Sequence, residues 1–251
     1  MSKKIIIIPY RNRKEHKEIF INHMKHILDP DIEIIFIHQK DKRPFNRGAV
    51  KNIGFLYIKN IYPSTYKDIT LIFHDIDYMP YKKGIIPYDT KHGEISHFFG
   101  FKFALGGIFA IKGGDFEKIR GFPNYWGWGF EDNRILDKWK EINGVMNYDH
   151  FHDIKNRSII RLHNTYDRRR IWNKKNVDYL KTDNAHSSGF DTLKQVKYVT
   201  EELQDNIKMV NVSSFLTERG HEEQQFRLSM PPKKLTARKI SLMSEIFQSQ
   251  R

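Results

Sequence analysis

The chain contains no cysteine and no long hydrophobic run. Without cysteine it cannot form disulfides, bind zinc or an iron–sulfur cluster through thiolates, or use a cysteine nucleophile. No apolar stretch approaches the roughly 18 residues that a membrane-spanning helix needs, and the apolar run at residues 5–8 is too short for the core of a signal peptide. These absences predict a protein without a membrane span and favour a cytoplasmic location, in a viral or bacterial setting among others.

Positive charge is the most unusual feature of the composition. The 251 residues include 43 Lys and Arg against 30 Asp and Glu, which gives a formal net charge of +13 at pH 7. Such an excess is compatible with nucleic-acid binding, or with a solvated basic surface and a basic pocket for phosphate groups. Because 39% of the residues are hydrophobic and 14% are aromatic, the chain can bury a sizeable core.

Short β-branched runs alternate with helical patterns through the first half of the chain, which is typical of an α/β sheet. We predict strands over residues 5–8, 32–37, 70–73, 95–99, 108–111, 158–162, 195–200 and 207–212. We predict helices over residues 14–28, 46–61, 115–119 and 131–142. After residue 217 the chain turns polar, so we expect one α/β domain over residues 1–217 and a polar tail or peripheral helix over residues 218–251.

Paired carboxylates follow the third predicted strand, in the motif Asp75-Ile76-Asp77. Ligands of open α/β sheets bind at the carboxyl ends of the strands. There, one carboxylate can coordinate a hard divalent cation while the other reaches a ribose hydroxyl or a water. A solvated turn leading into Met79 and Pro80 is the plainer interpretation of this motif alone.

The first two predicted strands end in an aromatic residue followed by arginine. Arg11 and Arg13 could hold a diphosphate with forked donors, and Tyr10 offers a ring face to a base. Phe45 and Arg47 repeat this arrangement after the second strand. Together with the paired carboxylates, these strand ends predict a site for a nucleotide, its diphosphate and a metal.

The segment from Trp126 to Asp132, WGWGFED, interleaves two tryptophans with glycines and ends in two carboxylates. The apolar face of a sugar stacks on tryptophan, and a carboxylate can take a hydroxyl proton. The alternative is a tryptophan-rich turn before the acidic first turn of a helix. His163 ends another predicted strand, and its imidazole suits manganese or zinc, although a lone histidine is more often structural.

In their order and approximate spacing from residue 5 to residue 215, these motifs resemble the β-1,4-galactosyltransferase family, which has the GT-A fold. The matching pieces are IPYRNR at residues 8–13, FNR at 45–47, HDID at 74–77, GG at 106–107, GFPNYWGWGFED at 121–132, His163, and GFDTL at 189–193. The resemblance implies a single Rossmann-like GT-A domain, with a mixed, mostly parallel sheet flanked by helices.

The resemblance also implies an inverting, metal-dependent transfer of galactose or N-acetylgalactosamine from a UDP-sugar to a sugar hydroxyl of a carbohydrate or glycoconjugate acceptor. Asp132 would be the general base, Glu131 would bind acceptor hydroxyls, and Asp77 with His163 would hold Mn²⁺ or possibly Mg²⁺. Residues 164–176 would form a lid. The implied donor-binding residues are Pro9, Tyr10, Arg11, Arg13, Phe45, Arg47, Asp75, Ala104, Gly106, Gly107 and Trp128.

Three positions depart from the pattern of this family. Ile160 stands where vertebrate members have a methionine metal ligand, so metal affinity and the preference for manganese become less certain. Asn133 replaces a third carboxylate that members often have, which affects acceptor recognition. Ala104 stands where galactose-specific members have tyrosine, and its small side chain leaves room for the N-acetyl group of UDP-GalNAc.

Two other function classes remain to be weighed. A carbohydrate- or UDP-sugar-binding protein with weak catalysis is compatible with Ile160 and Asn133, whereas the carboxylates and His163 argue against it. A nucleic-acid-binding protein would explain the positive charge, but the chain has no recognisable nucleic-acid-binding module. We therefore expect no nucleic-acid partner and attribute Arg11, Arg13 and Arg47 to a diphosphate.

Overall fold

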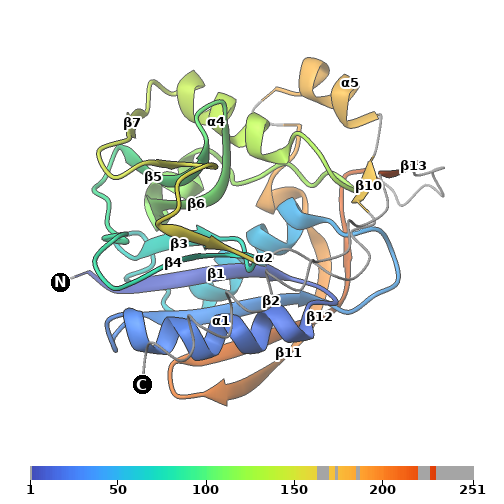
Figure 1. The fold of residues 1–251 in the computed structure, drawn as a ribbon. Coiled ribbons are helices and arrows are strands. Elements are labelled where there is room, and N and C mark those ends of the chain that lie inside the picture. The colour runs from blue at the N-terminus through green and yellow to red at the C-terminus, as the bar shows by residue number, and fades with distance from the viewer. Residues whose placement is uncertain (1, 163–169, 173–174, 185–186, 220–226, 230–251) are drawn as a thin grey trace.

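The computed structural model describes residues 2–162, 170–172, 175–184, 187–219 and 227–229 of the chain. Among these residues, nine strands form one sheet with the order β11-β12-β2-β1-β3-β6-β5-β7, and β8 lies beside β5 (Figure 1). The strands are β1 (Lys4–Tyr10), β2 (Glu33–Gln39), β3 (Thr70–His74), β5 (Glu94–Phe101), β6 (Ala104–Lys112), β7 (Val145–Asn147), β8 (His152–Asp153), β11 (Lys194–Gln204) and β12 (Ile207–Leu216).

The centre of the sheet is parallel. Strands β12, β2, β1 and β3 are parallel neighbours, whereas β6 is antiparallel to both β3 and β5, and β11 is antiparallel to β12. The carboxyl ends of β1, β2 and β3 therefore meet at one edge of the sheet, as the ends of parallel strands must. This arrangement confirms the predicted α/β fold with a mixed, mostly parallel sheet.

Helices cover both faces of the sheet. Ile5 and Ile7 of β1 point into one apolar cluster together with α2, while Ile6 and Ile8 point into a second cluster that includes Phe20 of α1. This alternation follows from the two-residue repeat of a strand. The helices are α1 (Lys14–Ile27), α2 (Arg47–Ile61), α3 (Gly113–Lys118), α4 (Glu131–Glu141) and α5 (Lys175–Thr182), with a 3₁₀ turn at Phe190–Thr192.

The principal predicted strands and helices are confirmed, within a few residues at their ends. The predicted strand at 158–162 is β9 (Ile159–Arg161), which pairs with β4 (Tyr78–Pro80) and lies outside the main sheet. The sequence analysis missed short strands such as β4, because two or three residues carry too little periodicity to recognise. It also missed the eight-residue helix α5. In the described part of the chain, no helix is long and apolar enough to cross a membrane.

The stretches expected to form a lid and a tail contain one described strand pair. Strand β10 (Arg170–Trp172) pairs antiparallel with β13 (Arg227–Ser229). Glu218, at the start of the expected tail, accepts hydrogen bonds from Asn124 and Thr192. A helix at 235–247 would lie outside the described residues, and the domain boundary at residue 217 stays a prediction.

Helix α2 lies very close to the sheet at Gly54. A β-carbon added there would lie 2.7 Å from Ile7 Cγ2 and 3.0 Å from Ile37 Cγ1. We predict that Gly54→Ala destabilises the protein by a net ~1–2 kcal/mol, because overpacking outweighs the gain in helix propensity. Urea unfolding measures this loss. Asn60→Ala, at an exposed position of the same helix, is the control, and equal stability of the two variants would contradict the close approach.

Candidate active site

Arg47 connects three segments that are far apart in the sequence. It is the first residue of α2, and its guanidinium lies 2.6 Å from Asp75 Oδ1, 2.8 Å from Glu131 Oε1 and 2.6 Å from Asp132 Oδ2. Asp75 directly follows β3, and both acidic residues open α4. The structure thus brings together four residues that the sequence analysis placed in one site, and the Arg47 side chain is only 15% exposed among them.

Lys51 completes this cluster, and the sequence analysis did not identify it. It lies one turn after Arg47 on α2, and its Nζ is 3.1 Å from Asp132 Oδ1. The side chain is 1% exposed, and Nζ also lies 4.2 Å from the centre of the Phe122 ring. The sequence did hold a signal for Lys51: it lies four residues after a candidate site arginine, on the apolar face of a predicted helix.

Asparagines fix the start of α2 against the segment that leads into α4. Asn46 caps α2 by accepting a hydrogen bond from the Ala49 amide, and its own side-chain amide donates to the Asn124 carbonyl. The Asn46 backbone amide donates to Gln39 Oε1 at the end of β2. Asn52 donates to the side chain of Asn124. A cap normally stabilises one helix; here the same residues also set the position of Arg47 relative to Glu131 and Asp132.

Two glycines of β6 border the cluster. Gly107 has φ of 76°, and a β-carbon there would lie 2.3 Å from the Phe99 carbonyl oxygen, so a larger residue does not fit. Its carbonyl accepts a hydrogen bond from the Asp75 amide. A β-carbon on Gly106 would lie 2.7 Å from Asp132 Oδ2. The backbone of β6 therefore lies close to the backbone of Asp75 and to the carboxylate of Asp132.

The two tryptophans before α4 have different surroundings. Trp126 is buried and stacks on Phe215, with ring centres 5.4 Å apart, so it belongs to the core. Trp128 is 43% exposed. The glycines interleaved with these tryptophans therefore do not keep Trp126 out of the core. The donor-binding role of Trp128 stays a prediction.

The arginine and aromatic residues after β1 and β2 contact the protein in ways that the sequence did not indicate. Arg11 donates to the carbonyls of Asp41 and Arg43 in the segment after β2. The Tyr10 ring is buried and packs edge-on against His38. Phe45 packs against the core on the α2 side of the sheet.

The remaining donor-site residues lie at the same edge of the sheet or beside it. Pro9 is buried near the end of β1, Arg13 precedes α1, and Ala104 is buried at the start of β6. The guanidinium groups of Arg47 and Arg11 both donate to protein groups in this structure. Their assignment to a donor site stays a prediction.

The predicted metal ligands can be compared with the structure only in part, because His163 lies outside the described residues. Asp77 precedes β4, and its backbone carbonyl accepts a hydrogen bond of 2.8 Å from the amide of Leu162, the residue before His163. Within the described residues, no three His, Asp or Glu side chains are grouped to hold a metal. The carboxylate of Asp77 is a ligand of the kind that hard divalent cations prefer. The described chain next to Asp77 ends at Leu162, one residue before His163.

The pKa values of Asp75 and Glu131 are shifted in opposite directions, although Arg47 and Lys51 lower both. Burial by itself would raise the pKa of Asp75, but Arg47 and Lys51 lower that pKa below its ordinary value. Burial and the neighbouring Asp132 raise the pKa of Glu131. Carboxyl groups with separated pKa values are a frequent feature of acid–base sites. Three carboxylates against two cations leave the cluster with one formal negative charge.

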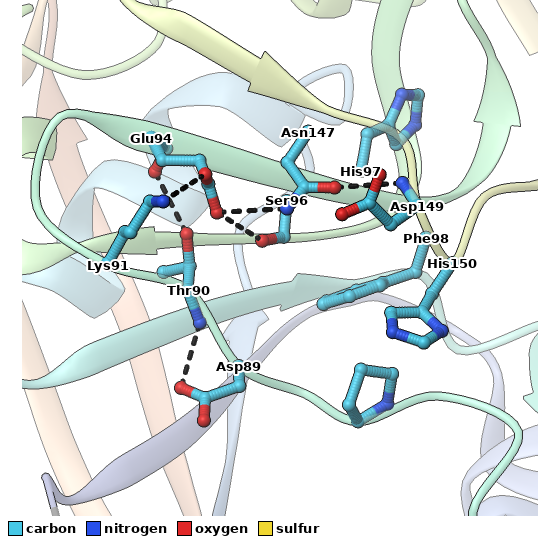
Figure 2. Close-up of a pocket in the computed structure, with 11 residues that line it drawn as sticks. Asp89, Thr90, Lys91, Glu94, Ser96, His97, Phe98, Asn147, Asp149 and His150 are labelled. Atoms are coloured by element: carbon cyan, nitrogen blue, oxygen red, sulfur yellow. Dashed lines mark hydrogen bonds and ion pairs between the residues drawn. The ribbon is translucent and has the colours of Figure 1, made fainter.

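A pocket of about 330 Å³ lies elsewhere, beside β5 and β7 (Figure 2). Glu94, at the start of β5, accepts hydrogen bonds from Ser96 and Asn147 and lies 3.4 Å from Lys91 Nζ. These polar groups satisfy one another, and none of the predicted site residues lines the pocket. The candidate site is therefore the Arg47 cluster, at the other end of β5.

Two family models match consecutive parts of the chain. The N-terminal region of glycosyl transferase group 7 matches residues 1–98, and the N-terminal domain of galactosyltransferase matches residues 97–162. Together they cover well over half of the chain, including the cluster around Arg47. The chain belongs to the β-1,4-galactosyltransferase family of glycosyltransferase group 7.

Individual members of this galactosyltransferase family show how far the likeness extends. Human β-1,4-galactosyltransferase 6 is 35% identical over 153 residues, which cover 56% of this chain and 38% of the human protein. Drosophila melanogaster β-1,4-galactosyltransferase 7 is 27% identical over 236 residues, covering 85% of this chain and 69% of that protein. The chain thus spans less than two fifths of the length of mammalian relatives such as the human enzyme.

Solved structures of the galactosyltransferase family confirm the expected GT-A fold. The catalytic domain of Drosophila β-1,4-galactosyltransferase 7 in complex with xylobiose aligns with a TM-score of 0.72 at 22% identity, covering 85% of this chain and 94% of that one. A mutant of the same protein in complex with manganese, UDP-Gal and xylobiose aligns with a TM-score of 0.69 at 21% identity.

We predict that Arg47→Met lowers the free energy of unfolding by about 3–5 kcal/mol at pH 7, because three carboxylates lose their shared cation. Without Arg47 the folded state holds the protons of these carboxyl groups more tightly than the unfolded state does. The deficit relative to wild type should therefore shrink as the pH falls from 7 to 5. Urea unfolding at both pH values measures it. Arg157→Met, at an exposed position, serves as the control, and a deficit that does not change with pH would contradict the argument.

Proposed function

We propose that this protein is an inverting, metal-dependent glycosyltransferase that moves galactose or N-acetylgalactosamine from a UDP-sugar to a sugar hydroxyl. The observation that carries the proposal is the convergence of Asp75 with Glu131 and Asp132 on one arginine, within a chain of the galactosyltransferase family. The Drosophila relative crystallised with UDP-Gal, manganese and xylobiose supports the choice of donor, metal and carbohydrate acceptor.

Asp132 is the general base of the proposed reaction. As the acceptor oxygen bonds to the anomeric carbon, the bond from that carbon to the UDP oxygen breaks, UDP leaves with the electron pair, and Asp132 takes the hydroxyl proton. Each carboxylate oxygen has two lone pairs, so Asp132 can accept this proton while Arg47 and Lys51 hold it. Positioned base catalysis of this kind contributes about 10²–10⁴-fold.

Glu131 binds the acceptor in this proposal. Its side chain is buried, with one carboxylate oxygen on Arg47 and the other accepting a hydrogen bond from the Gly129 amide. This fixed orientation suits a group that positions a hydroxyl beside Asp132. Asn133, which stands where a third carboxylate is common, donates to the Phe103 carbonyl and so ties α4 to the turn between β5 and β6.

Asp77 and His163 would hold the metal, Mn²⁺ or possibly Mg²⁺, and Asp75 would contact the nucleotide sugar. A bound divalent cation stabilises the negative charge that develops on departing UDP. Arg11 would add forked donors to the donor site once its carbonyl partners are exchanged for phosphate oxygens. Arg13 would add a second guanidinium there, and Arg47 would contribute its positive charge while it keeps its bond to Asp132. The cytoplasmic location and the absence of a nucleic-acid partner stay predictions.

We predict that the protein releases UDP from UDP-Gal in the presence of Mn²⁺ and an acceptor such as xylobiose, and that chelator abolishes this release. Asp132→Asn should lower kcat by about 10²–10⁴-fold, because the amide cannot take the proton. UDP binding, measured by calorimetry with Mn²⁺, should remain.

Asp137→Asn, at an exposed position of the same helix, is the matched control and should keep full turnover. If Asp132→Asn retained near-normal turnover, the assignment of the base would be wrong. If wild type bound UDP-Gal with Mn²⁺ but released no UDP with any sugar acceptor, the protein would be a binding protein and not an enzyme.

Ala104 makes the donor preference testable. It is buried two residues before Gly106, which borders Asp132. We propose that this small side chain leaves room for an N-acetyl group, so that UDP-GalNAc is used at least as well as UDP-Gal. Ala104→Tyr should lower kcat/KM for UDP-GalNAc by at least about tenfold relative to UDP-Gal, because the larger side chain competes for that space. Strict use of UDP-Gal by wild type would contradict this proposal.

A further inference from the structure

Lys51 is a buried lysine, and the packing of its side chain does not by itself explain why this position carries a charge. It lies on the face of α2 that enters the core, where its neighbours Val50 and Ile53 are also buried. Removing an ammonium group from water costs several kcal/mol unless it is compensated, and burial lowers the pKa of Lys51. An apolar side chain of similar length could fill the same space.

The compensation comes from one carboxylate. The ammonium of Lys51 donates to Asp132 Oδ1 at 3.1 Å. Arg47 contacts the other oxygen of Asp132 but is shared with Asp75 and Glu131. Of the three carboxylates, Lys51 donates a hydrogen bond to Asp132, while its charge also lowers the pKa of Asp75.

These contacts fix the Asp132 carboxylate from several sides. Lys51 holds Oδ1, Arg47 holds Oδ2, and the backbone at Gly106 lies against Oδ2 closely enough to exclude a β-carbon. A carboxylate held at both oxygens cannot rotate freely about its side-chain torsions. Its remaining lone pairs then point in fixed directions, which is what a general base requires.

We propose that Lys51 is a positioning residue for the base, which fixes the orientation of the Asp132 carboxylate; this inference rests on the proposed function. The charged groups facing Asp132 are Lys51 and Arg47 of α2, Glu131 of α4, and Asp75 after β3, while His97 of β5 acts at longer range. A cation at hydrogen-bond distance favours the ionised form of a carboxyl group.

The test is Lys51→Met, which keeps a similar length and volume without the charge. We expect kcat at neutral pH to fall about tenfold or more, with a smaller change in KM for the UDP-sugar. The acid limb of the kcat profile should move to higher pH by about one unit, because the carboxylate has lost a cation. Lys51→Arg, which keeps the charge, should show a smaller shift of that limb.

Lys59→Met is the matched control. Lys59 lies on the same helix, its side chain is 39% exposed, and it pairs with Glu117 at the surface. We expect its pH profile and kcat to equal those of wild type. An unchanged pH profile and kcat in Lys51→Met would overturn the proposal and leave Lys51 a structural residue.

A double-mutant cycle separates this inference from the proposed function. Urea unfolding of wild type, Lys51→Met, Asp132→Asn and the double variant measures the coupling of the pair without any activity. Asp132→Asn should destabilise the protein more in the wild-type background than in the Lys51→Met background. Only in the wild-type background does the substitution leave the buried Lys51 ammonium without its carboxylate partner. Additive effects would overturn the pairing. An inactive wild type with a coupled pair would refute the proposed function alone.

Discussion

The sharing of one buried arginine by three carboxylates is the interaction on which the candidate site depends. Arg47 is placed by the start of α2, Asp75 by the end of β3, and Glu131 and Asp132 by the start of α4. Three carboxylates this close together would repel one another strongly if they were unpaired. The arginine fork lets them approach, because its two terminal nitrogens can serve different acceptors in one plane. The position of Asp132, the proposed base, is therefore set largely by a cation that takes no proton in the proposed reaction.

The rest of the fold keeps that arginine in place. Parallel strands bring the segments after β1, β2 and β3 to one edge of the sheet, and the asparagine contacts around Asn46 and Asn124 join the start of α2 to the segment before α4. The glycine pair of β6 allows the backbone to pass close beside Asp75 and Asp132. Each of these features would be of little consequence singly. Together they leave few other positions for the Asp132 carboxylate.

The sequence allowed much of this to be predicted, for identifiable reasons. Long periodic segments such as α2 and β1 were recognisable from their hydrophobic pattern, and the strand-end motifs pointed to one edge of the sheet. The pairing of β4 with β9 could not be predicted, because three-residue strands have no pattern of their own. Lys51 was missed because a lysine within a helical pattern is normally solvated. The present partners of Arg47 could not be predicted either, since a motif shows which residue types are present but not which of them pair when no ligand is bound.

Charge balance gives an independent reason for the proposed metal dependence. The whole chain is strongly positive, with a formal net charge of +13, yet the cluster itself has three carboxylates against two cations. Asp77, two residues after Asp75 in the sequence, adds a fourth carboxylate. A UDP-sugar carries a negatively charged diphosphate, which such a cluster would repel. Arg11 is engaged with backbone carbonyls, so a divalent cation on Asp77 is the direct way to reverse the local sign. In the proposed reaction, the negative charge of the residues around Asp132 is thus the reason that a divalent cation is needed when the UDP-sugar binds.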